Sequence, residues 1–291
     1  MSKVLVLAGG AVKGAYQAGV IRTLFESGFQ PDAIYGISAG SLNASYLVNQ
    51  FGMQAVEESP IDYAQAGKDL WDFWEMRITH PGSLFVPWSI FELGYTALVK
   101  KFKGLVDTSP LRNLVEDSLQ MRNLHASPIA LKVGAVNIID GGIKYVDPSV
   151  DSFFSFLMAS CAVPILMPVV NIGNNMNQNY LDGGLRNVSP ICKAIEDGAT
   201  EIVAISCHPE QIEGGNFDTG DLLALVDRVM DIAVNEILNA DLQAAKMMNE
   251  TKVNPVKIRS IRPVQPLQID MQNFNKFDIR RLLELGFQVN C

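Results

Sequence analysis

The sequence contains few of the side chains that build metal centres and disulfide frameworks. Among its 291 residues there are four cysteines and three histidines, and no two cysteines form a CxxC pair. Without such pairs or a regular spacing, neither a zinc site nor a disulfide scaffold is predicted. We therefore expect no metal site, and reduced thiols of the kind found in cytosolic proteins, at the four cysteines: Cys161, Cys192, Cys207 and Cys291.

Basic residues are also in the minority. Lysine and arginine number 23 against 31 aspartates and glutamates, which gives a formal net charge of -8. A broad basic footprint for nucleic acid is therefore missing, and no nucleic-acid partner is predicted. The acidic balance also opposes tight adhesion to an anionic bilayer, although a local patch would still allow transient contact with a membrane surface.

No apolar run approaches the roughly 18 residues needed to span a membrane. After Lys3, the first apolar stretch runs only from Val4 to Ala8, too short for the core of a secretory signal, which needs about 7 to 15 residues. We expect neither a transmembrane segment nor a signal peptide, and a cytoplasmic protein, with export by another route left open.

What the chain does contain is typical of a folded globular protein. Hydrophobic residues make up 48% and charged residues 19%, and the length suits one or two domains. Since no internal repeat or low-complexity linker is present, a single domain over residues 1–291 is predicted.

The first 50 residues predict a βαβ unit. Val4–Leu7 is a buried-strand pattern that ends in a glycine-rich loop, and a helical pattern comes next. A second apolar run, Ala33–Tyr35, precedes another helical pattern. This order implies a mostly parallel sheet covered by helices, that is, an α/β fold.

The second strand leads into the pentapeptide Gly36-Ile37-Ser38-Ala39-Gly40. A Gly-x-Ser-x-Gly sequence where a strand turns sharply into a helix is the context of a nucleophile elbow. Ser38 would then project at a helix N-terminus, where unpaired N–H groups favour developing negative charge. Because glycine and serine are common in turns, the pentapeptide by itself is also compatible with a turn that carries no chemistry.

The glycine loop after the first strand is the candidate oxyanion hole. It matches neither the Walker pattern, since Ala15 and Tyr16 come after Gly14, nor the Rossmann pattern. Its backbone N–H groups suit an oxyanion instead. A lysine near a helix N-terminus is mildly unfavourable, so Lys13 indicates either a locally positive site or a solvated side chain. The candidate oxyanion residues are Gly9, Gly10, Ala11, Lys13 and Gly14.

Residues 53–104 form an aromatic-rich, largely helical insert. Asp62–Trp74 is predicted to be a helix, and Pro81-Gly82 and Pro87 interrupt the regular structure beyond it. Such aromatics either line an acyl-chain pocket or act as a lid, or they simply pack in the core. The residues concerned are Trp71, Phe73, Trp74, Phe85, Trp88, Phe91, Tyr95 and Phe102.

The remaining chain predicts a series of strands and helices. Asp140-Gly141-Gly142 is typical of a tight turn between two strands. Strands are expected over Ile129–Ile139, Ile143–Val146, Val169–Ile172, Gln178–Leu181, Glu201–Cys207 and Val256–Ile261, and helices over Phe153–Ser160, Pro190–Asp197, Asp221 to about Asn249, and Lys276–Leu285.

The residues alone leave open which base would activate Ser38. Asp182-Gly183-Gly184 stands at the end of a predicted strand. A Ser-Asp-His triad is formally available in the order Ser38, Asp182, His208. The early position of the elbow leaves little room for the strands that precede it in α/β hydrolases, which disfavours the triad.

Four stretches together resemble the patatin-like phospholipase family. They are Gly9–Gly14, which resembles the family's oxyanion loop; Gly36–Gly40, its elbow; Ser160–Pro164 with Pro168, its small-residue segment; and Leu181–Pro190, its Asp-Gly-Gly segment. This resemblance implies a three-layer patatin-like fold and a Ser38–Asp182 dyad without histidine that cleaves acyl esters of lipids. The chain departs from the family at Ala11, where a third glycine is usual; the methyl group would narrow the oxyanion loop or alter its dihedral angles.

The sequence therefore predicts a serine acyl hydrolase whose substrate and partner is a lipid, with phospholipids and lysophospholipids as the expected classes, and whose chemistry needs no cofactor. The oligomeric state is left open. A non-catalytic binding or scaffold protein that kept the pocket is the rival prediction, and Ala11 is the residue that favours it.

Overall fold

The computed structural model describes residues 2–89, 92, 103–212 and 220–290. Its described strands form an eight-stranded sheet in the order β10-β9-β1-β2-β5-β8-β7, with β6 paired to β5, and a separate β3-β4 pair. The strands are β1 (Lys3–Leu7), β2 (Ala33–Ile37), β3 (Val86–Pro87), β4 (Val106–Asp107), β5 (Ala130–Asn137), β6 (Ile143–Val146), β7 (Val170–Asn171), β8 (Asn179–Asp182), β9 (Glu201–Ile205) and β10 (Lys257–Ile261).

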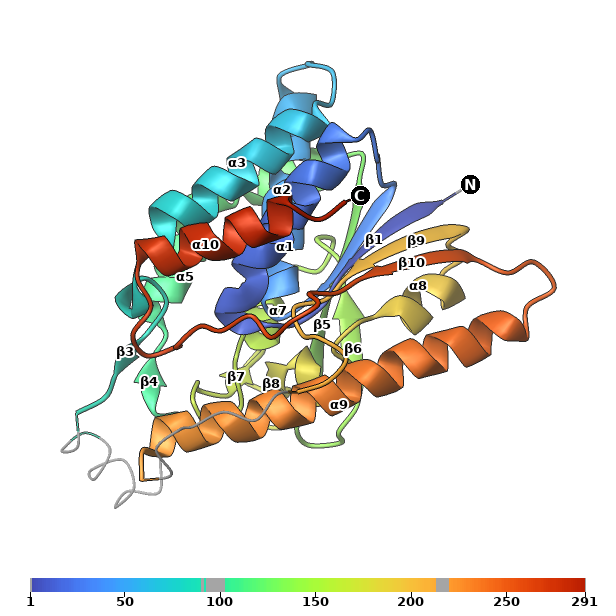
Figure 1. Ribbon diagram of the computed structural model, residues 1–291. Helices are drawn as coiled ribbons and strands as arrows, with labels where there is room; N and C mark the ends of the chain where they lie inside the picture. The colour runs from blue at the N-terminus through green and yellow to red at the C-terminus, as the bar shows by residue number, and fades with distance from the viewer. Residues whose placement is uncertain (1, 90–91, 93–102, 213–219, 291) are drawn as a thin grey trace.

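Helices cover both faces of the sheet (Figure 1), so the expected three-layer α/β arrangement is confirmed. One layer holds α1 (Gly14–Glu26), α2 (Ala39–Val56), α3 (Tyr63–Arg77), α5 (Ser109–Ser118), α6 (Met121–Ala126), α7 (Phe153–Ser160) and α10 (Lys276–Phe287). The other holds α8 (Ile191–Glu196) and α9 (Leu222–Glu250). Short 3-10 turns lie at η1 (Ala11–Lys13), η2 (Pro81–Ser83) and η3 (Gly183–Leu185).

The two layers result from the alternation of side chains along each strand. In β1, Leu5 and Leu7 belong to the core under α1, α2 and α10, whereas Val4 and Val6 pack with α8 and α9. Both faces of the strand are thus buried, as its uninterrupted apolar run predicts. Among the described helices, none combines the length and hydrophobicity needed to cross a bilayer.

Most helices and strands begin and end where capping or turn residues in the sequence predict a boundary. α3 begins after Asp62, whose Oδ1 accepts a hydrogen bond from the Gln65 N–H at 2.9 Å, and α9 begins after Asp221 in the same way. The strand expected up to Ile139 is shorter than predicted. β5 ends at Asn137, and Ile138 and Ile139 lie exposed in a turn that Gly141 closes with a φ of 72°.

The register of β5 explains how Asp182 reaches the elbow. β2 pairs in parallel with residues 130–134 of β5, and β6 pairs with the opposite edge. β8 shares Ala135 with β6, so it must occupy the same edge of β5 as β2, just beyond the end of β2. It runs antiparallel there, and Asp182 at its end therefore lies beside the residue after Ile37.

Candidate functional site

Ser38 sits at the junction of β2 and α2 in a strained backbone conformation. Its φ of 54° and ψ of -128° are rare for a residue with a side chain, and such strain is kept only where the surroundings enforce it. The Ser38 N–H donates to the Ser160 Oγ at 3.0 Å, and the Ser38 carbonyl oxygen accepts from the first turn of α2. The turn expected from the sequence is therefore a true elbow.

The two glycines of the elbow are required by close backbone packing. A Cβ added at Gly36 would lie 2.4 Å from the carbonyl oxygen of Gly40, and one added at Gly40 would lie 2.1 Å from that of Leu7. Neither contact is tolerable for a real side chain. The Gly-x-Ser-x-Gly spacing thus reflects how tightly α2 folds back over β2 and β1.

Asp182 meets Ser38 from the end of β8. Its side chain makes a hydrogen bond with the Ser38 side chain, and its Oδ1 accepts the Gly184 N–H at 2.7 Å. Burial raises the pKa of the Asp182 carboxyl to about 6, although the hydrogen bonds with Ser38 and Gly184 oppose this shift. A carboxylate with this pKa is a far better base at neutral pH than an exposed aspartate.

The segment at the end of α7 forms hydrogen bonds with both Ser38 and Asp182. Ser160 holds the Ser38 N–H, the Cys161 thiol lies 3.3 Å from the Ser38 carbonyl oxygen, and the Ala162 carbonyl oxygen accepts the Asp182 N–H at 3.0 Å. This small-residue segment, singled out in the sequence only by resemblance, therefore positions Ser38 against Asp182.

The glycine loop lies beside Ser38, but only part of it is available to bind an oxyanion. The Gly9 N–H donates to Val188, and the N–H groups of Lys13 and Gly14 close the η1 turn. Among the described residues, no hydrogen bond uses the N–H of Gly10 or Ala11. These two amides are the free donors of the predicted set, and both residues line the pocket at Ser38.

Ala11 keeps a conformation that glycine adopts more easily. Its φ is 48°, in the left-handed region, which costs a residue with a Cβ about 1 kcal/mol. Ala11 itself lines the pocket at Ser38. The two effects that the sequence raises for its methyl group, a narrower oxyanion loop or altered dihedral angles, stay predictions.

A buried polar network behind the loop was not predicted from the sequence. The Gln17 side chain donates to the carbonyl oxygens of Ala8 and Ile205, and the Asn43 side chain donates to that of Gly14. The Trp74 indole N–H completes the network by donating to Asn43 at 2.7 Å. Polar residues on helical faces are common, so only their burial identifies these three as supports of the loop.

Lys13 and His208 lie on the other side of the loop, with Asp231 of α9. The Lys13 Nζ is 2.5 Å from the Asp231 Oδ1, and its side chain is 16% exposed. Lys13 is therefore ion-paired and mostly buried, so of the two alternatives that the sequence left open for it, the solvated side chain does not hold. The His208 Nε2 contacts Asp231 and Lys13, while its Nδ1 has no partner among the described residues, so neither ring nitrogen serves Ser38 or Asp182.

Three connected hollows meet at this site. Ser38 lines a pocket of about 80 Å³, shared with Asp182 and the glycine loop, and an apolar cavity of about 50 Å³. A larger cleft of about 730 Å³ runs between α9 and residues 268–273. Val163 and Met271 line all three, so they form the apolar partition between the cleft and Ser38.

The aromatic residues of the predicted insert divide between two roles. Phe73 and Trp74 are buried in the core, and Trp71 makes an edge-to-face contact with Phe287. Trp74 and Phe85 also line the apolar cavity beside Ser38, as a pocket lining requires. Phe91, Tyr95 and Phe102 lie outside the described residues, so the lid hypothesis stays a prediction.

In the described parts of the chain, no group of three or more histidine, cysteine or acidic side chains is arranged to hold a metal ion. The described cysteines, Cys161, Cys192 and Cys207, are free thiols.

Comparison with known proteins identifies relatives of this chain. Two patatin-like phospholipase domain-containing proteins of Cryptococcus neoformans var. neoformans serotype D, from strains B-3501A and JEC21 / ATCC MYA-565, are each 28% identical to it over 208 residues. The match covers 65% of this chain and only 22% and 21% of those proteins, so the chain corresponds to about a fifth of their length. The crystal structure of VipD from Legionella pneumophila matches 98% of this chain and 65% of that one, at 15% identity and a TM-score of 0.41.

A family model described as "Patatin-like phospholipase" matches residues 5–195, which hold the glycine loop, the elbow, the small-residue segment and Asp182. Since this match spans more than half of the chain, the protein belongs to the patatin-like phospholipase family.

Proposed function

We propose that this protein is a serine acyl hydrolase that cleaves carboxylic esters of lipids, with phospholipids and lysophospholipids as its substrate class. The observation that carries the proposal is that the strained residue Ser38 and the buried Asp182 line one pocket together with the glycine loop. Burial raises the pKa of the Asp182 carboxyl in this pocket to about 6. Membership of the family supports the reaction class.

In the proposed mechanism, Asp182 takes the Ser38 hydroxyl proton as the Oγ attacks the ester carbonyl carbon. The carbonyl oxygen becomes an oxyanion, which the Gly10 and Ala11 N–H groups stabilise; one such donor is typically worth about 3 kcal/mol in the transition state. The alcohol leaves with the proton from Asp182. Asp182 then deprotonates a water molecule, which attacks the acyl-enzyme. The bond between the acyl carbon and the Ser38 Oγ breaks, the Oγ takes the proton back from Asp182, and the carboxylic acid is released.

The hollows around Ser38 suit an acyl chain on one side and a larger group on the other. The apolar cavity, bounded by Leu42, Trp74 and Phe85, is fit for the start of an acyl chain. The adjoining cleft carries both aspartate and arginine side chains and has room for a glycerophosphate head group. Because Ser38 is only 6% exposed, we expect Val163 and Met271 to move when substrate enters.

Two rivals are tested with the same protein. A Ser-Asp-His esterase would use His208, whose nearest polar partners are instead Asp231 and Lys13. A binding or scaffold protein is favoured by the Ala11 methyl group in the pocket and by the small volume at Ser38.

The test is hydrolysis of lysophosphatidylcholine and phosphatidylcholine in mixed micelles, with the released fatty acid measured by mass spectrometry. Ser38→Ala and Asp182→Asn are each expected to lose at least ~10³-fold in turnover, because nucleophile and base act as one unit. In His208→Gln, where the amide can still donate to Asp231, most turnover is expected to remain. Turnover lost in His208→Gln as completely as in Ser38→Ala would favour the triad, because the dyad does not use His208. Folded wild type without Ser38-dependent turnover would favour the binding protein.

A further inference from the structure

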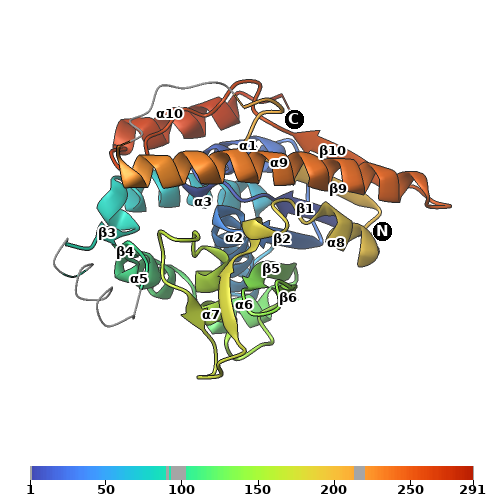
Figure 2. The same ribbon diagram turned by 90° about the horizontal axis from the view of Figure 1, so that it is seen from below.

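α9 lies outside residues 5–195, which match the family, yet it contacts the loop that the proposed mechanism depends on. Figure 1 shows this long helix running below the sheet, and Figure 2, seen from below, shows it in front of the strands along most of the molecule. Two of its carboxylates, Asp231 and Asp241, are turned toward the site, ten residues apart on one helix.

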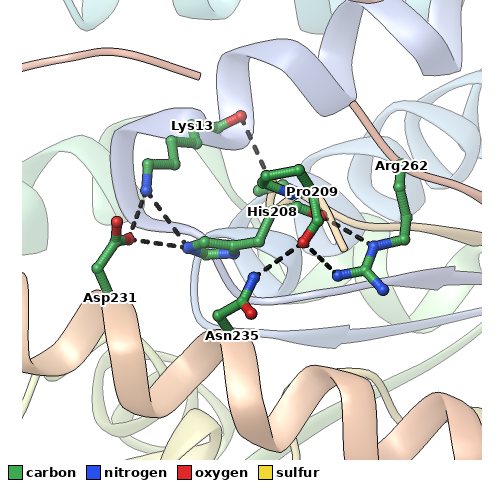
Figure 3. Close-up of polar contacts among 7 residues, drawn as sticks. Lys13, His208, Pro209, Asp231, Asn235 and Arg262 are labelled. Carbon is green, nitrogen blue, oxygen red and sulfur yellow. Dashed lines mark hydrogen bonds and ion pairs between the residues drawn. The ribbon is translucent and has the colours of Figure 1, made fainter. Parts of the chain in front are cut away.

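Asp231 holds the C-terminal end of the glycine loop. Figure 3 shows its carboxylate between the Lys13 Nζ, at 2.5 Å, and the His208 Nε2, at 3.0 Å from the same oxygen. Burial raises the pKa of Asp231, but the hydrogen bond from His208 and the positive charge of Lys13 outweigh it, and the pKa falls well below its usual range. Asp231 is therefore ionised near neutral pH, as the ion pair with Lys13 requires.

His208 holds the Asp231 carboxylate in place through a hydrogen bond and adds no positive charge beside it. Burial lowers the pKa of the ring despite the hydrogen bond with Asp231, so the imidazole is neutral near pH 7. A carboxylate accepts and an ammonium group donates, so Nε2 can carry its proton toward Asp231 but cannot then accept from Lys13. Arg262 holds the His208 carbonyl oxygen at 3.0 Å, and Asn235 of α9 holds that of Pro209 at 2.8 Å, which anchors this histidine (Figure 3).

Asp241 holds the N-terminal end of the same loop. Its Oδ2 accepts the N–H groups of Val188 and Ser189 at 2.7 and 2.9 Å, and the Val188 carbonyl oxygen accepts the Gly9 N–H at 3.0 Å. Val188 is therefore the residue that connects Asp241 of α9 to Gly9 by hydrogen bonds. Between the two anchored ends lie Gly10 and Ala11, whose N–H groups are unused within the described structure.

We propose that α9 is the positioning element of the oxyanion loop, and that Asp231, through Lys13, and Asp241, through Val188, are its positioning residues. Neither carboxylate touches the reacting atoms. Each fixes one end of the loop, so that the Gly10 and Ala11 N–H groups stay aimed at the space beside Ser38. The expected effect on kcat rests on the proposed function. The expected effect on the position of the glycine loop does not.

A matched set of charge-removing variants on α9 tests the proposal. Asp231→Asn keeps the shape of the side chain and removes its charge, and Glu236→Gln makes the same change at an exposed position of the same helix. Because oxyanion donors act in the transition state, Asp231→Asn is expected to lower kcat by ~10- to 100-fold with KM changed less than about twofold. Glu236→Gln should match wild type.

A double-mutant cycle separates positioning from a general loss of stability. Lys13→Met should cost about as much in kcat as Asp231→Asn, and the double variant should be little worse than either, since both remove one ion pair. Lys13→Arg, which keeps the charge, should restore most of the loss. Additive losses, or an Asp231→Asn variant with wild-type kcat, would overturn the proposal.

Amide hydrogen exchange gives a second measurement that does not need activity. Exchange at residues 9–14 should speed up by at least ~10-fold in Asp231→Asn and Asp241→Asn and stay unchanged in Glu236→Gln. If the wild type shows no Ser38-dependent turnover but the exchange has this pattern, the proposed function fails while α9 still positions the loop. If turnover depends on Ser38 and neither kcat nor exchange responds to Asp231→Asn, this inference fails alone.

Discussion

In the proposed mechanism, a single buried carboxyl, that of Asp182, determines whether Ser38 can react. An exposed aspartate has a pKa near 3.9 and is a weak base, and a fully buried one without partners would be neutral at pH 7. Asp182 lies between these limits because burial is offset by hydrogen bonds with Ser38 and Gly184, and its pKa is raised to about 6. The proposed dyad needs no third residue to bring the base into the working range.

This value predicts the acid limb of the pH–rate profile. The base must be deprotonated, so kcat/KM for ester cleavage should rise with pH through a midpoint of about 6 and level off above about pH 7. Released acid measured by mass spectrometry from about pH 4 to about pH 8 gives the curve. Burial also raises the pKa of Asp241 to about 6, so Asp241→Asn is the control, and it should lower the plateau without moving the midpoint. A midpoint near pH 4 would show that Asp182 is not the base.

At the scale of single residues, the sequence predicts the two members of the proposed dyad but not the α9 residues that contact the glycine loop and its neighbours. Ser38 and Asp182 stand in short motifs, where neighbouring glycines mark the conformation each needs. Asp231 and Asp241 give no such signal, since an acidic residue on a long amphipathic helix is usually solvated. Their partners, Lys13 and Val188, lie far away in the sequence, and only the tertiary fold reveals the contacts.

Among the elements, the elbow leaves no room for an added side chain at its glycines. Gly40 lets α2 pass directly over the end of β1, and a Cβ there would lie 2.1 Å from the Leu7 carbonyl oxygen and 2.8 Å from that of Ala8. These two carbonyl groups belong to the backbone at the end of β1. They cannot move away from the new Cβ without moving the strand that leads into the glycine loop.

Gly40→Ala is therefore expected to destabilise the protein by more than about 3 kcal/mol or to prevent folding, because the overlap is with backbone rather than with a flexible side chain. The control is Gly142→Ala in the β5–β6 turn, where the new Cβ meets only the Asp140 side chain at 3.1 Å and the expected cost is below about 1 kcal/mol. Urea unfolding monitored by circular dichroism measures both. Similar midpoints for the two variants would contradict the packing described for the elbow.

Strand and helix positions could largely be predicted, because apolar periodicity and capping residues are local. α10, for example, begins at Lys276 as expected, after an Asn275 cap that Asp278 reciprocates. The pairing of β8 with the far part of β5 could not be predicted. β5 extends beyond the last residue of β2, and β8 pairs with this extension. The resulting register places Asp182 beside Ser38.

In the molecule as a whole, the site is formed where both helical layers meet one end of the sheet. The layer with α1 and α2 supplies the elbow and the loop, and α9 from the opposite layer fixes the loop in place. The family match accounts for the first of these contributions and ends before α9. The chain corresponds to only about a fifth of its Cryptococcus relatives, so its substrate has to be established on this protein itself.

The most direct test of the account is covalent labelling of Ser38 by a fluorophosphonate, located by mass spectrometry of the digested protein. The dyad predicts that folded wild type is labelled at Ser38, that Ser38→Ala is not labelled, and that Asp182→Asn reacts at least ~100-fold more slowly because the hydroxyl has lost its base. Folded wild type that stays unlabelled with and without phosphatidylcholine vesicles, or that reacts at the same rate after Asp182→Asn, would contradict it.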